Sequence, residues 1–513
     1  MYRTNSLAKY LAPFVLAVSL LGLYLYTLAP GLTWANDGSD GGDLITAAAT
    51  GGIPHPTGYP LYLLVARLFQ LLPLGSLAFC TNLLSAVATS LAAVLVYELV
   101  VRKLPQSEGI PAWPGGLAAG YAFGLAPLVW SQAVITEVYA LHGLLILLIF
   151  YLYSSAAPVE TVRQKRLDRW RGLLLGLAMG NHLTTIFLVF PALFLGSSNW
   201  KRKNDVLSDE GQPPSRILKL NLVPLRRQAL WFVIGLCVYL TLPARALAHP
   251  PVDWGNPVTL DRFWWLISGG VYQWYYLPQS LAGLWGQIQA WATLLIDQFG
   301  LPGLALGFTG LILFWKTSRL YVLTSWTALV FSAFAILYRA ADSYVYLIPV
   351  VISFAIWIGE GISGLAQALF RRFLRSGLFL GLLVAAYFCG RAAVNIKDVD
   401  ASKDLRADNF GYEVLSSTPK DALVFAKGDR AVFALWYFHL ALQERPDLIV
   451  VASDLLHFDW YMETLQGIYP ALVLPGSLPY PETIMRANPS RATCYVQYNN
   501  RPEIECFEPI RPP

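Results

Sequence analysis

Charged residues are scarce in this chain. Only 13% of its 513 residues are Asp, Glu, Lys or Arg, whereas 56% are hydrophobic. Soluble domains carry about 25% charged residues, so this composition excludes an ordinary soluble protein. The formal net charge is +5, and the basic residues gather in a few loops. We therefore interpret the positive excess as a topology signal and expect no nucleic-acid partner.

Motifs of several common chemistries are also missing. The sequence has no P-loop, no GxSxG motif and no His/Cys spacing typical of a metal site. We therefore expect neither a bound metal nor another cofactor. No internal repeat is evident, which argues against a transporter built from inverted repeats.

Cysteine is rare, with five in the whole chain. Cys80, Cys237 and Cys389 lie in or beside apolar segments and are expected to be inert. Cys494 and Cys506 lie twelve residues apart in the polar C-terminal tail. These two could form a disulfide if the tail is outside the cytoplasm, and a pair of free thiols is the open alternative.

Long apolar runs are abundant instead. A helix that crosses a bilayer needs about 20 mostly apolar residues, and many runs approach or reach this length. The clearest are Tyr10–Ala29, Asn82–Val101, Leu141–Tyr153, Ala229–Leu247, Leu320–Tyr338, Tyr344–Gly364 and Gly377–Gly390. The first run has no clear cleavage site after it, so we interpret it as an uncleaved span whose N-terminus is inside. The chain is predicted to be a multi-pass membrane protein.

The distribution of basic residues predicts the orientation. Arg163–Arg171 holds five basic residues and Lys201–Arg227 holds seven. Pro30–Pro56 holds none, and His249–Ser280 holds only Arg262. Because cytoplasmic loops are enriched in Lys and Arg, the first two loops are placed inside and the last two outside.

The apolar segment Gly172–Gly196 lies between the two basic loops. A single crossing would put one of these loops outside, so we predict a re-entrant hairpin of two half-helices that turns at Asn181 and His182. Such a break is tolerated only where it is buried in protein or lines a cavity. With this hairpin, the fold is predicted as about nine full spans, including Leu117–Val134, Thr136–Tyr153 and Phe299–Trp315. Two further segments, Leu61–Leu72 and Leu284–Asp297, are predicted as surface-lying amphipathic helices.

The composition becomes that of a soluble domain from about residue 395. Short buried strands are predicted at Ala422–Phe425 and Leu448–Val451, with a helix at Ala431–Gln443 between them. We therefore divide the chain into a transmembrane module, residues 1–394, and a small extracytoplasmic α/β domain, residues 395–513. The module carries outer loops at residues 30–60 and 248–298.

The first outer loop holds Asp37, Asp40 and Asp43 without any Lys or Arg nearby. An ionised carboxylate beside a reacting centre can act as a general base. Asp40 and Asp43 are three residues apart and share a face on a helical turn, whereas Asp37 precedes Gly38 and is typical of a turn. Capping and solvation of a surface loop is the alternative role for these carboxylates.

The same loop continues into His55-Pro56-Thr57-Gly58-Tyr59-Pro60. Two prolines fix the backbone of this corner. The corner could present His55 and Tyr59 at the rim of a cavity, or it could simply start a helix at Pro60.

Two other polar groups lie at predicted breaks between apolar segments. Glu137 and Tyr139 follow the outer junction of two spans, where a carboxylate is costly unless it is paired or faces water. Glu137 could hold a substrate or only favour the start of a helix. Asn181 and His182 occupy the break of the predicted hairpin, either at a site or as satisfied core groups.

The second outer loop offers an Arg followed by a polar and aromatic motif. Arg245 ends a span, and Asp253-Trp254-Gly255-Asn256 follows. An Arg can bind phosphate oxygens bidentately, and Trp stacks on sugar rings. Snorkelling and an aromatic belt are the alternative. Arg339 and Asp342 repeat the theme at another outer helix end, with a mutual salt bridge as their alternative.

Several of these motifs resemble one known family. The run from Asp40 to Leu44, DGGDL, and HPTGYPLY from His55 are similar to the family, found in bacteria and eukaryotes, that includes the transmembrane protein O-mannosyltransferase of the plexin and receptor-kinase type. Further similar stretches are QAVITEVYAL from Gln132, GLAMGNHLTT from Gly176, LPAR from Leu242, DWGNPVTL from Asp253, GDRAVFALWY from Gly428 and Arg445-Pro446-Asp447. The resemblance spans nearly the whole chain.

The resemblance implies a GT-C glycosyltransferase in a prokaryotic plasma membrane. Such an enzyme takes a sugar, here mannose or another hexose, from a polyprenyl-phosphate carrier outside the cytoplasm and passes it to a protein or glycan hydroxyl. The family's base in the first outer loop corresponds to Asp40, with Asp43 second. Relatives commonly have Glu where Asp43 stands and Pro where Thr57 stands, so the choice between the two carboxylates stays open.

The chemistry implied by the resemblance is an inverting substitution. The base takes the proton of the acceptor hydroxyl as its oxygen attacks the anomeric carbon, and cations such as Arg245 or Arg339 stabilise the departing phosphate. A transporter or flippase for lipid-linked glycans is the alternative. The concentration of polar residues on outer loops favours the enzyme.

Overall fold

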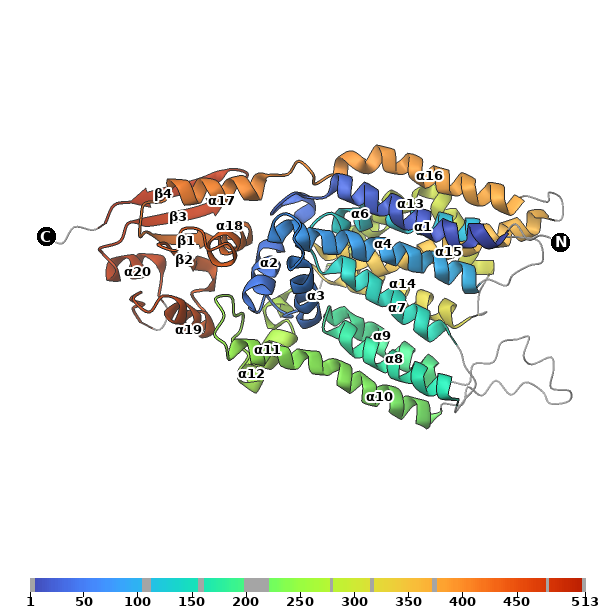
Figure 1. Ribbon diagram of the computed structural model, residues 1–513, viewed down its shortest axis with the longest axis horizontal. Coiled ribbons are helices and arrows are strands. Elements are labelled where there is room, and N and C mark those ends of the chain that lie inside the picture. Colours follow the sequence, from blue (N-terminus) through green and yellow to red (C-terminus); the bar gives the residue numbers. More distant parts are fainter. Residues whose placement is uncertain are drawn as a thin grey trace.

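The computed structural model describes residues 5–103, 112–155, 161–197, 221–276, 280–313, 318–370, 376–476 and 479–509. It consists of an elongated bundle of helices that carries a small sheet region at one end, on the left of Figure 1. We call this the sheet end of the bundle. The predicted polytopic helical fold is confirmed, and so is a C-terminal region of mixed strands and helices.

The bundle is built from apolar helices that pack along their length. They are α1 (Asn5–Thr27), α4 (Leu77–Lys103), α5 (Trp113–Gly124), α6 (Pro127–Ala133), α7 (Tyr139–Ser154), α8 (Val162–Met179), α9 (Ile186–Ser197), α10 (Leu222–Leu236), α13 (Leu281–Leu313), α14 (Arg319–Leu337), α15 (Ile348–Phe370) and α16 (Ser376–Val399). Helix α15 is apolar on all sides, and 94% of its most apolar stretch is buried, so it forms the centre of the bundle.

Within the described residues, seven helices are long and apolar enough to cross a membrane. The structure supports these seven candidate spans, and the predicted total of about nine full spans stays a prediction. The predicted span Leu117–Val134 is in fact two short helices, α5 and α6, because Pro127 begins a new helix after the break at Ala126. The predicted span Thr136–Tyr153 is the shorter helix α7.

The predicted hairpin exists, but it does not turn half-way along the bundle. The backbone N–H of Leu61 donates to the carbonyl of Gly180, and the Asn181 amide donates to the carbonyl of Val138. The turn therefore lies level with the starts of α3 (Pro60–Gln70) and α7, at the sheet end. Helices α8 and α9 run from this turn toward the opposite end (Figure 1). The prediction of a hairpin that turns back inside the membrane was wrong. The sequence shows where the helix breaks, but it does not show at which level of the bundle the break lies. Most of the basic loop 201–227 lies outside the described residues.

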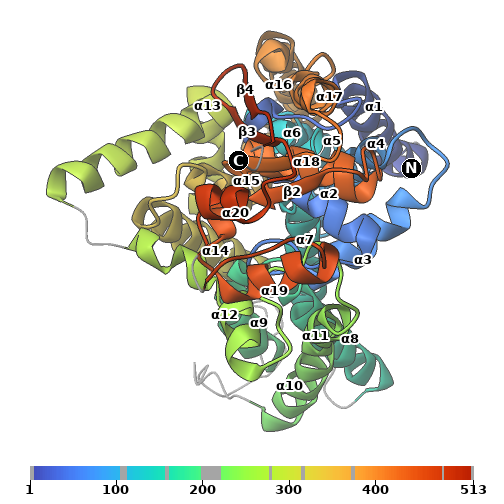
Figure 2. The ribbon, with the colours of Figure 1, turned by 90° about the vertical axis from the view of Figure 1, so that its left-hand side faces the viewer.

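Helix α13 joins two predicted elements, Leu284–Asp297 and Phe299–Trp315. Gly300 has φ +63° and bends the helix there, since a left-handed residue cannot continue a straight α-helix. The part before the bend extends sideways from the bundle in Figure 2, as expected for a surface-lying helix. The other predicted surface helix, Leu61–Leu72, is α3 at the sheet end.

The C-terminal region contains a four-stranded sheet in the order β2-β1-β3-β4. Strands β1 (Leu423–Lys427), β2 (Ile449–Ala452) and β3 (Thr493–Tyr498) are parallel, and β4 (Pro502–Phe507) is antiparallel to β3. The predicted strands correspond to β1 and β2, and the predicted helix to α18 (Asp429–Trp436) with a π-helical turn, Tyr437–Ala441. The remaining helices are α17 (Arg406–Ser417), α19 (Asp459–Ile468) and α20 (Pro481–Ala487).

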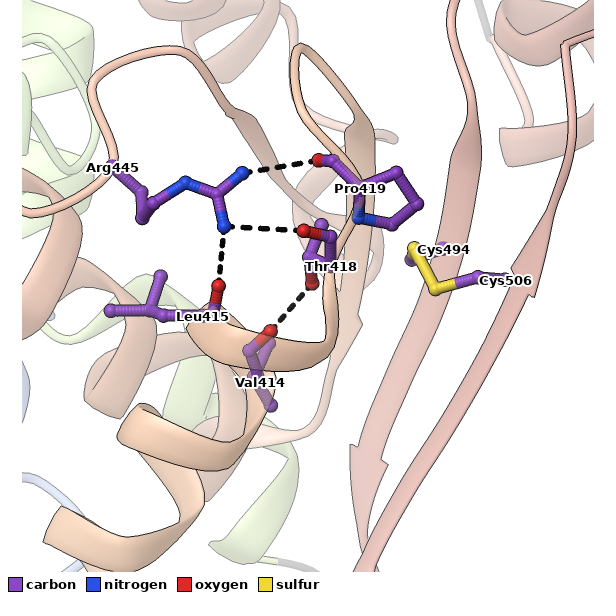
Figure 3. The surroundings of a disulfide bond; sticks show 7 residues. All are labelled: Val414, Leu415, Thr418, Pro419, Arg445, Cys494 and Cys506. Carbon is purple, nitrogen blue, oxygen red and sulfur yellow. Dashed lines mark hydrogen bonds between the residues drawn. A yellow bond between two sulfur atoms is a disulfide. The ribbon is translucent and has the colours of Figure 1, made fainter.

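Two features reinforce this region (Figure 3). Cys494 and Cys506 form a disulfide that joins β3 to β4 in register, which decides between the two alternatives left open by the sequence. The Arg445 guanidinium donates to carbonyls of Leu415, Thr418 and Pro419 at the end of α17. It also forms an ion pair with Asp447, so the Arg-Pro-Asp motif has a structural role here.

The first loop joins the bundle to the C-terminal region. Helix α2 (Gly41–Thr50) packs directly on α18, and an added Cβ at Gly42 would lie 2.3 Å from the carbonyl oxygen of Phe433. A glycine is therefore needed for this close approach. The Asp404 carboxylate accepts hydrogen bonds from Thr33 Oγ1 and the Trp34 backbone. The loop and the C-terminal region thus form one unit at the sheet end.

Candidate functional site

A polar cavity of about 400 Å³ lies at the sheet end, between the first loop and the C-terminal region. Its walls come from the first loop, the α6–α7 connection, the segments before α13 and α15, and the start of α18. The lining residues are Asn36, Asp37, Ser39, Asp40, His55, Tyr59, Gln132, Glu137, Tyr139, Tyr272, Tyr275, Tyr338, Ala340, Ala341, Asp342, Tyr344, Val345, Tyr346, Asp429 and Arg430. Segments far apart in the sequence therefore build one acid-rich pocket.

Asp40 and Asp43 occupy different positions in this pocket. Asp40 precedes α2, lines the cavity, and its side chain is 35% exposed. The side chain of Asp43 is fully buried and is not among the lining residues. Its Oδ2 accepts hydrogen bonds from the backbone N–H of His55 and from Nδ1 of the imidazole, at 2.8 and 2.7 Å. Asp43 therefore holds His55 from behind.

His55 connects the two carboxylates. Its Nε2 lies 3.6 Å from Oδ2 of Asp40 and 3.2 Å from the Tyr59 hydroxyl. Burial lowers the pKa of the imidazole, but the charge of Asp40 and the hydrogen bond and charge of Asp43 outweigh burial and raise that pKa to about 9. At neutral pH His55 is therefore a cation between two carboxylates. Of these two, Asp40 is the one that faces the cavity.

The predicted residues Tyr59, Glu137, Tyr139 and Asp342 all line the cavity. Burial, and less strongly the charge of Asp40, raise the pKa of Asp342 above its usual value. Asp37 also lines the cavity, although its position suggested only a turn, and it accepts a 2.8 Å hydrogen bond from Tyr344.

Asn181 and His182 lie just behind this wall. The His182 ring contacts the rings of Tyr59, Tyr139 and Tyr346, and its Nδ1 is hydrogen-bonded to Thr184 Oγ1. Neither Asn181 nor His182 is a lining residue. The break in the apolar segment therefore supports the tyrosines that face the cavity.

Four predicted residues in or beside the second loop are not among the lining residues: Arg245, Asp253, Trp254 and Asn256. Arg245 donates to the carbonyl of Gly52, and Asp253 forms an isolated β-bridge with Ile53, next to the His55 corner. Burial is the main cause that raises the pKa of Asp253 to about 7. These contacts fix the backbone of the first loop from outside.

Trp254 and Asn256 face the C-terminal region instead. The Trp254 ring is buried and packs on Phe433, Trp436 and Trp460. Asn256 donates to Glu463, which also pairs with Arg262. The sequence suggested that Trp254 stacks on a sugar. It could not show that aromatic residues of the C-terminal region cover this ring.

The arginine that lines the cavity was not predicted. Arg339 has an exposed side chain and is not a lining residue, whereas Arg430 of α18 is. Asp429 beside it is exposed, and partial desolvation by the surrounding protein, together with the charge of Asp40, raises its pKa to about 6. The only signal for these two residues was the family-like GDRAVFALWY stretch in the tail. Gln132 begins the family-like stretch QAVITEVYAL, whereas the lining residues Tyr272, Tyr275 and Tyr338 gave no signal.

A metal site is not evident in the part of the chain that the structure describes. No group of three or more His, Cys, Asp or Glu side chains there is arranged to hold a metal ion. The metal-independent chemistry expected from the sequence stays a prediction.

Two models of one protein family match segments that supply part of the cavity lining. The model described as Protein O-mannosyl-transferase TMEM260 N-terminal domain matches residues 40–205, and TMEM260-associated domain 2 matches residues 407–503. This chain belongs to the TMEM260 family. The family predicted from the sequence, membrane proteins of the protein O-mannosyltransferase type, is confirmed.

Individual relatives agree with the family models. Protein O-mannosyl-transferase tmem260 of Dictyostelium discoideum is 24% identical over 517 residues, which cover 91% of this chain and 60% of that protein. Protein O-mannosyl-transferase TMEM260 of Mus musculus is 27% identical over 504 residues, covering 93% and 67%. The chain thus spans about two thirds or less of the length of these relatives.

The fold is also similar to a solved membrane protein. ArnT from Cupriavidus metallidurans, in a crystal structure bound to undecaprenyl phosphate, is 13% identical, with a TM-score of 0.58 and coverage of 95% of this chain and 93% of that one. Its apo form has a TM-score of 0.59, 14% identity and coverage of 96% and 94%. The TMEM260-family chain therefore has an ArnT-like fold.

Proposed function

We propose that this chain transfers a hexose, mannose in the first instance, from a polyprenyl-phosphate carrier to a hydroxyl group of an acceptor protein. The observation that carries this proposal is the position of Asp40, a cavity-facing carboxylate beside a cationic His55. The family supports transfer of mannose to protein. The undecaprenyl phosphate in the ArnT crystal supports a lipid carrier for the donor.

The proposed reaction is a single inverting displacement. Asp40 accepts the proton of the acceptor hydroxyl while its oxygen forms a bond to the anomeric carbon. The bond between that carbon and the phosphate oxygen breaks on the opposite face. Polyprenyl phosphate leaves with the electron pair, and the proton ends on Asp40.

The remaining cavity residues have separate proposed roles. Arg430 stabilises the charge that develops on the departing phosphate, a role that the cavity geometry does not support for Arg245 or Arg339. His55 lies beside Asp40 and places a positive charge next to it, and Asp43 positions His55. Glu137, Asp342 and the tyrosines offer hydrogen bonds to the sugar hydroxyls. Neither a metal nor another cofactor is part of this proposal.

The proposed reaction takes place outside the cytoplasm. The basic residues that begin α8 lie at the end of the bundle opposite the cavity, so the positive-inside bias places the sheet end outside. The disulfide between Cys494 and Cys506 supports this orientation, because disulfides persist in oxidising compartments. The N-terminus would then be inside and residues 395–513 would form the extracytoplasmic domain.

The direct test is transfer by the purified chain from polyprenyl-phosphate-mannose to hydroxyl-bearing peptides, followed by mass spectrometry. We expect Asp40→Asn to lower the rate by about 10²- to 10⁴-fold, the usual contribution of a general base. Asp261→Asn, an exposed residue of α12 (Leu260–Ile267) outside the cavity, should leave the rate unchanged. Full transfer by a folded Asp40→Asn variant would refute the proposal. Movement of the labelled lipid across proteoliposomes without a new glycosidic bond would favour the transporter alternative.

A further inference from the structure

The proposed catalytic cavity is the first of three neighbouring hollows that share lining residues. The nearer one, about 290 Å³, shares Ser39, Asp429 and Arg430 with the cavity. It also contains Lys427, which belongs to the lining of a larger hollow of about 880 Å³. Because neighbouring hollows share lining residues, we treat the three as one series. A pocket for one small ligand usually has a volume of about 300–1,000 Å³. The series is larger than one sugar requires.

The connecting hollow lies at a favoured binding position of the sheet. Strand β1 is followed by β2 on one side, and β3 pairs on its other side. The crevice beyond the carboxyl ends of two such strands is where open α/β sheets usually bind ligands. Gly428 and Tyr498 stand at these ends of β1 and β3. A Cβ at Gly428 would meet no atom within 4 Å, so the passage is open there.

The largest hollow is the open face of the sheet. Phe425 and Lys427 of β1 are in register with Tyr495 and Gln497 of β3, which pair with Glu505 and Glu503 of β4, and all six line the hollow. These side chains share one face because alternate residues of a strand point the same way. Asp454, Glu482 and Arg501 complete its charged groups, giving four carboxylates against two cations.

We infer that this series of hollows binds an extended polypeptide acceptor, with its reacting hydroxyl in the cavity and its flanking residues along the sheet face. The inference rests on the proposed function and adds a second binding site to it. The excess of carboxylates selects Lys or Arg in the flanking segment. A neutral glycan would gain nothing from that charge, which is why a polypeptide fits the surface better.

Binding is tested first, without any reaction. Fluorescein-labelled peptides with a central Thr, flanked by Lys residues or by Glu residues, are titrated against the purified full chain and followed by fluorescence polarisation. Glu482→Lys with Glu505→Lys is the test variant, since both side chains are exposed and their replacement should not disturb the fold. Glu413→Lys on α17 makes the same charge change at an exposed position outside the hollows.

We expect the basic peptide to bind at least tenfold more tightly than the acidic one. The double variant should lose at least tenfold in affinity, and Glu413→Lys should bind like the unmodified chain. Unchanged affinity in the double variant would overturn the inference. Equal binding of both peptides, or competition by a neutral mannose oligosaccharide, would do the same.

A transfer assay then separates this inference from the proposed function. The double variant should raise KM for the basic peptide at least tenfold without changing kcat, while transfer to a short alcohol that cannot reach the sheet face stays unchanged. An unchanged KM would refute the acceptor surface and leave the enzyme proposal intact. If the unmodified chain transferred sugar to none of the acceptors, the enzyme proposal would be refuted. The binding experiment would still show whether the sheet face binds basic peptides.

Discussion

At the scale of single residues, the structure separates carboxylates that the sequence could not rank. Spacing places Asp40 and Asp43 on one side of a helical turn, so either could be the base. In the fold, Asp40 faces the cavity whereas Asp43 is buried behind His55. The difference arises because α2 packs against α18, and that contact covers one carboxylate and leaves the other open.

The ionisation of His55 predicts a pH dependence of stability. Its pKa is about 9 in the fold and about 6.5 in an unfolded chain. Because the folded value is higher, the stabilisation is fully present below pH 6.5 and is lost as pH rises through 9, to an extent of about 3 kcal/mol at most. Thermal unfolding in detergent should therefore show a falling midpoint across this window. His55→Gln should flatten the fall, whereas the exposed His457→Gln should not. An identical pH profile in the two variants would contradict the ion-pair assignment.

At the scale of elements, two contacts fix the cavity: α2 on α18, and the second loop on the C-terminal region. The apolar runs and the motif around Asp253 were visible in the sequence. Their partners were not, because the aromatic residues that cover Trp254, namely Phe433, Trp436 and Trp460, lie far along the chain in the C-terminal region. Periodicity reports which face of an element is apolar and not what covers it.

The close approach of α2 and α18 gives a test with a built-in control. A Gly42→Val side chain would clash with the Phe433 carbonyl at 2.3 Å, whereas an added Cβ at Gly41 meets Thr136 at an ordinary 3.6 Å. We expect Gly42→Val to lower the free energy of unfolding by about 1–3 kcal/mol and to reduce transfer, because Asp40 and Arg430 would move apart. Gly41→Ala should retain both properties. Normal activity in a folded Gly42→Val chain would show that the two helices need not be so close.

Trp254 tests whether the second loop packs or binds substrate. Removing its buried ring should cost about 3 kcal/mol of unfolding free energy, as for other large core side chains. Arg262→Ala should cost less than about 1 kcal/mol, because its pair with Glu463 is partly exposed. If packing is the role, the KM for the lipid donor stays unchanged in Trp254→Ala. A large rise in that KM with unchanged stability would restore the sugar-binding role predicted from the sequence.

At the scale of the whole molecule, the C-terminal sheet lies at one end of the helical bundle (Figures 1 and 2). Residues of the C-terminal region and of the first loop line the acid-rich cavity at this end. Seven long apolar helices among the described residues, together with shorter ones, carry this end. The predicted span Leu117–Val134 was wrong because α5 and α6 together resemble one continuous apolar run in the sequence. The location of the hairpin turn required the contacts of Gly180 and Asn181.

The orientation can be tested by cysteine labelling of intact cells with a membrane-impermeant maleimide. A cysteine at Glu413, exposed on α17, should be labelled without permeabilisation, since the sheet end is proposed to lie outside. A cysteine at Arg166, exposed near the start of α8, should be labelled only after the membrane is opened. The reverse pattern would place the cavity in the cytoplasm and contradict the proposed donor side.

The sequence by itself determined that the chain is a multi-pass membrane protein with an acidic first loop, a soluble tail and a recognisable family. These properties follow from local composition and short motifs, which do not depend on distant contacts. Only the tertiary structure decided that Asp40 faces a cavity, that Asp43 supports His55, and that Trp254 packs on the tail. It also brought Arg430 to the site. Those outcomes depend on which segments meet, and burial by a distant partner decides whether a polar side chain is available for chemistry.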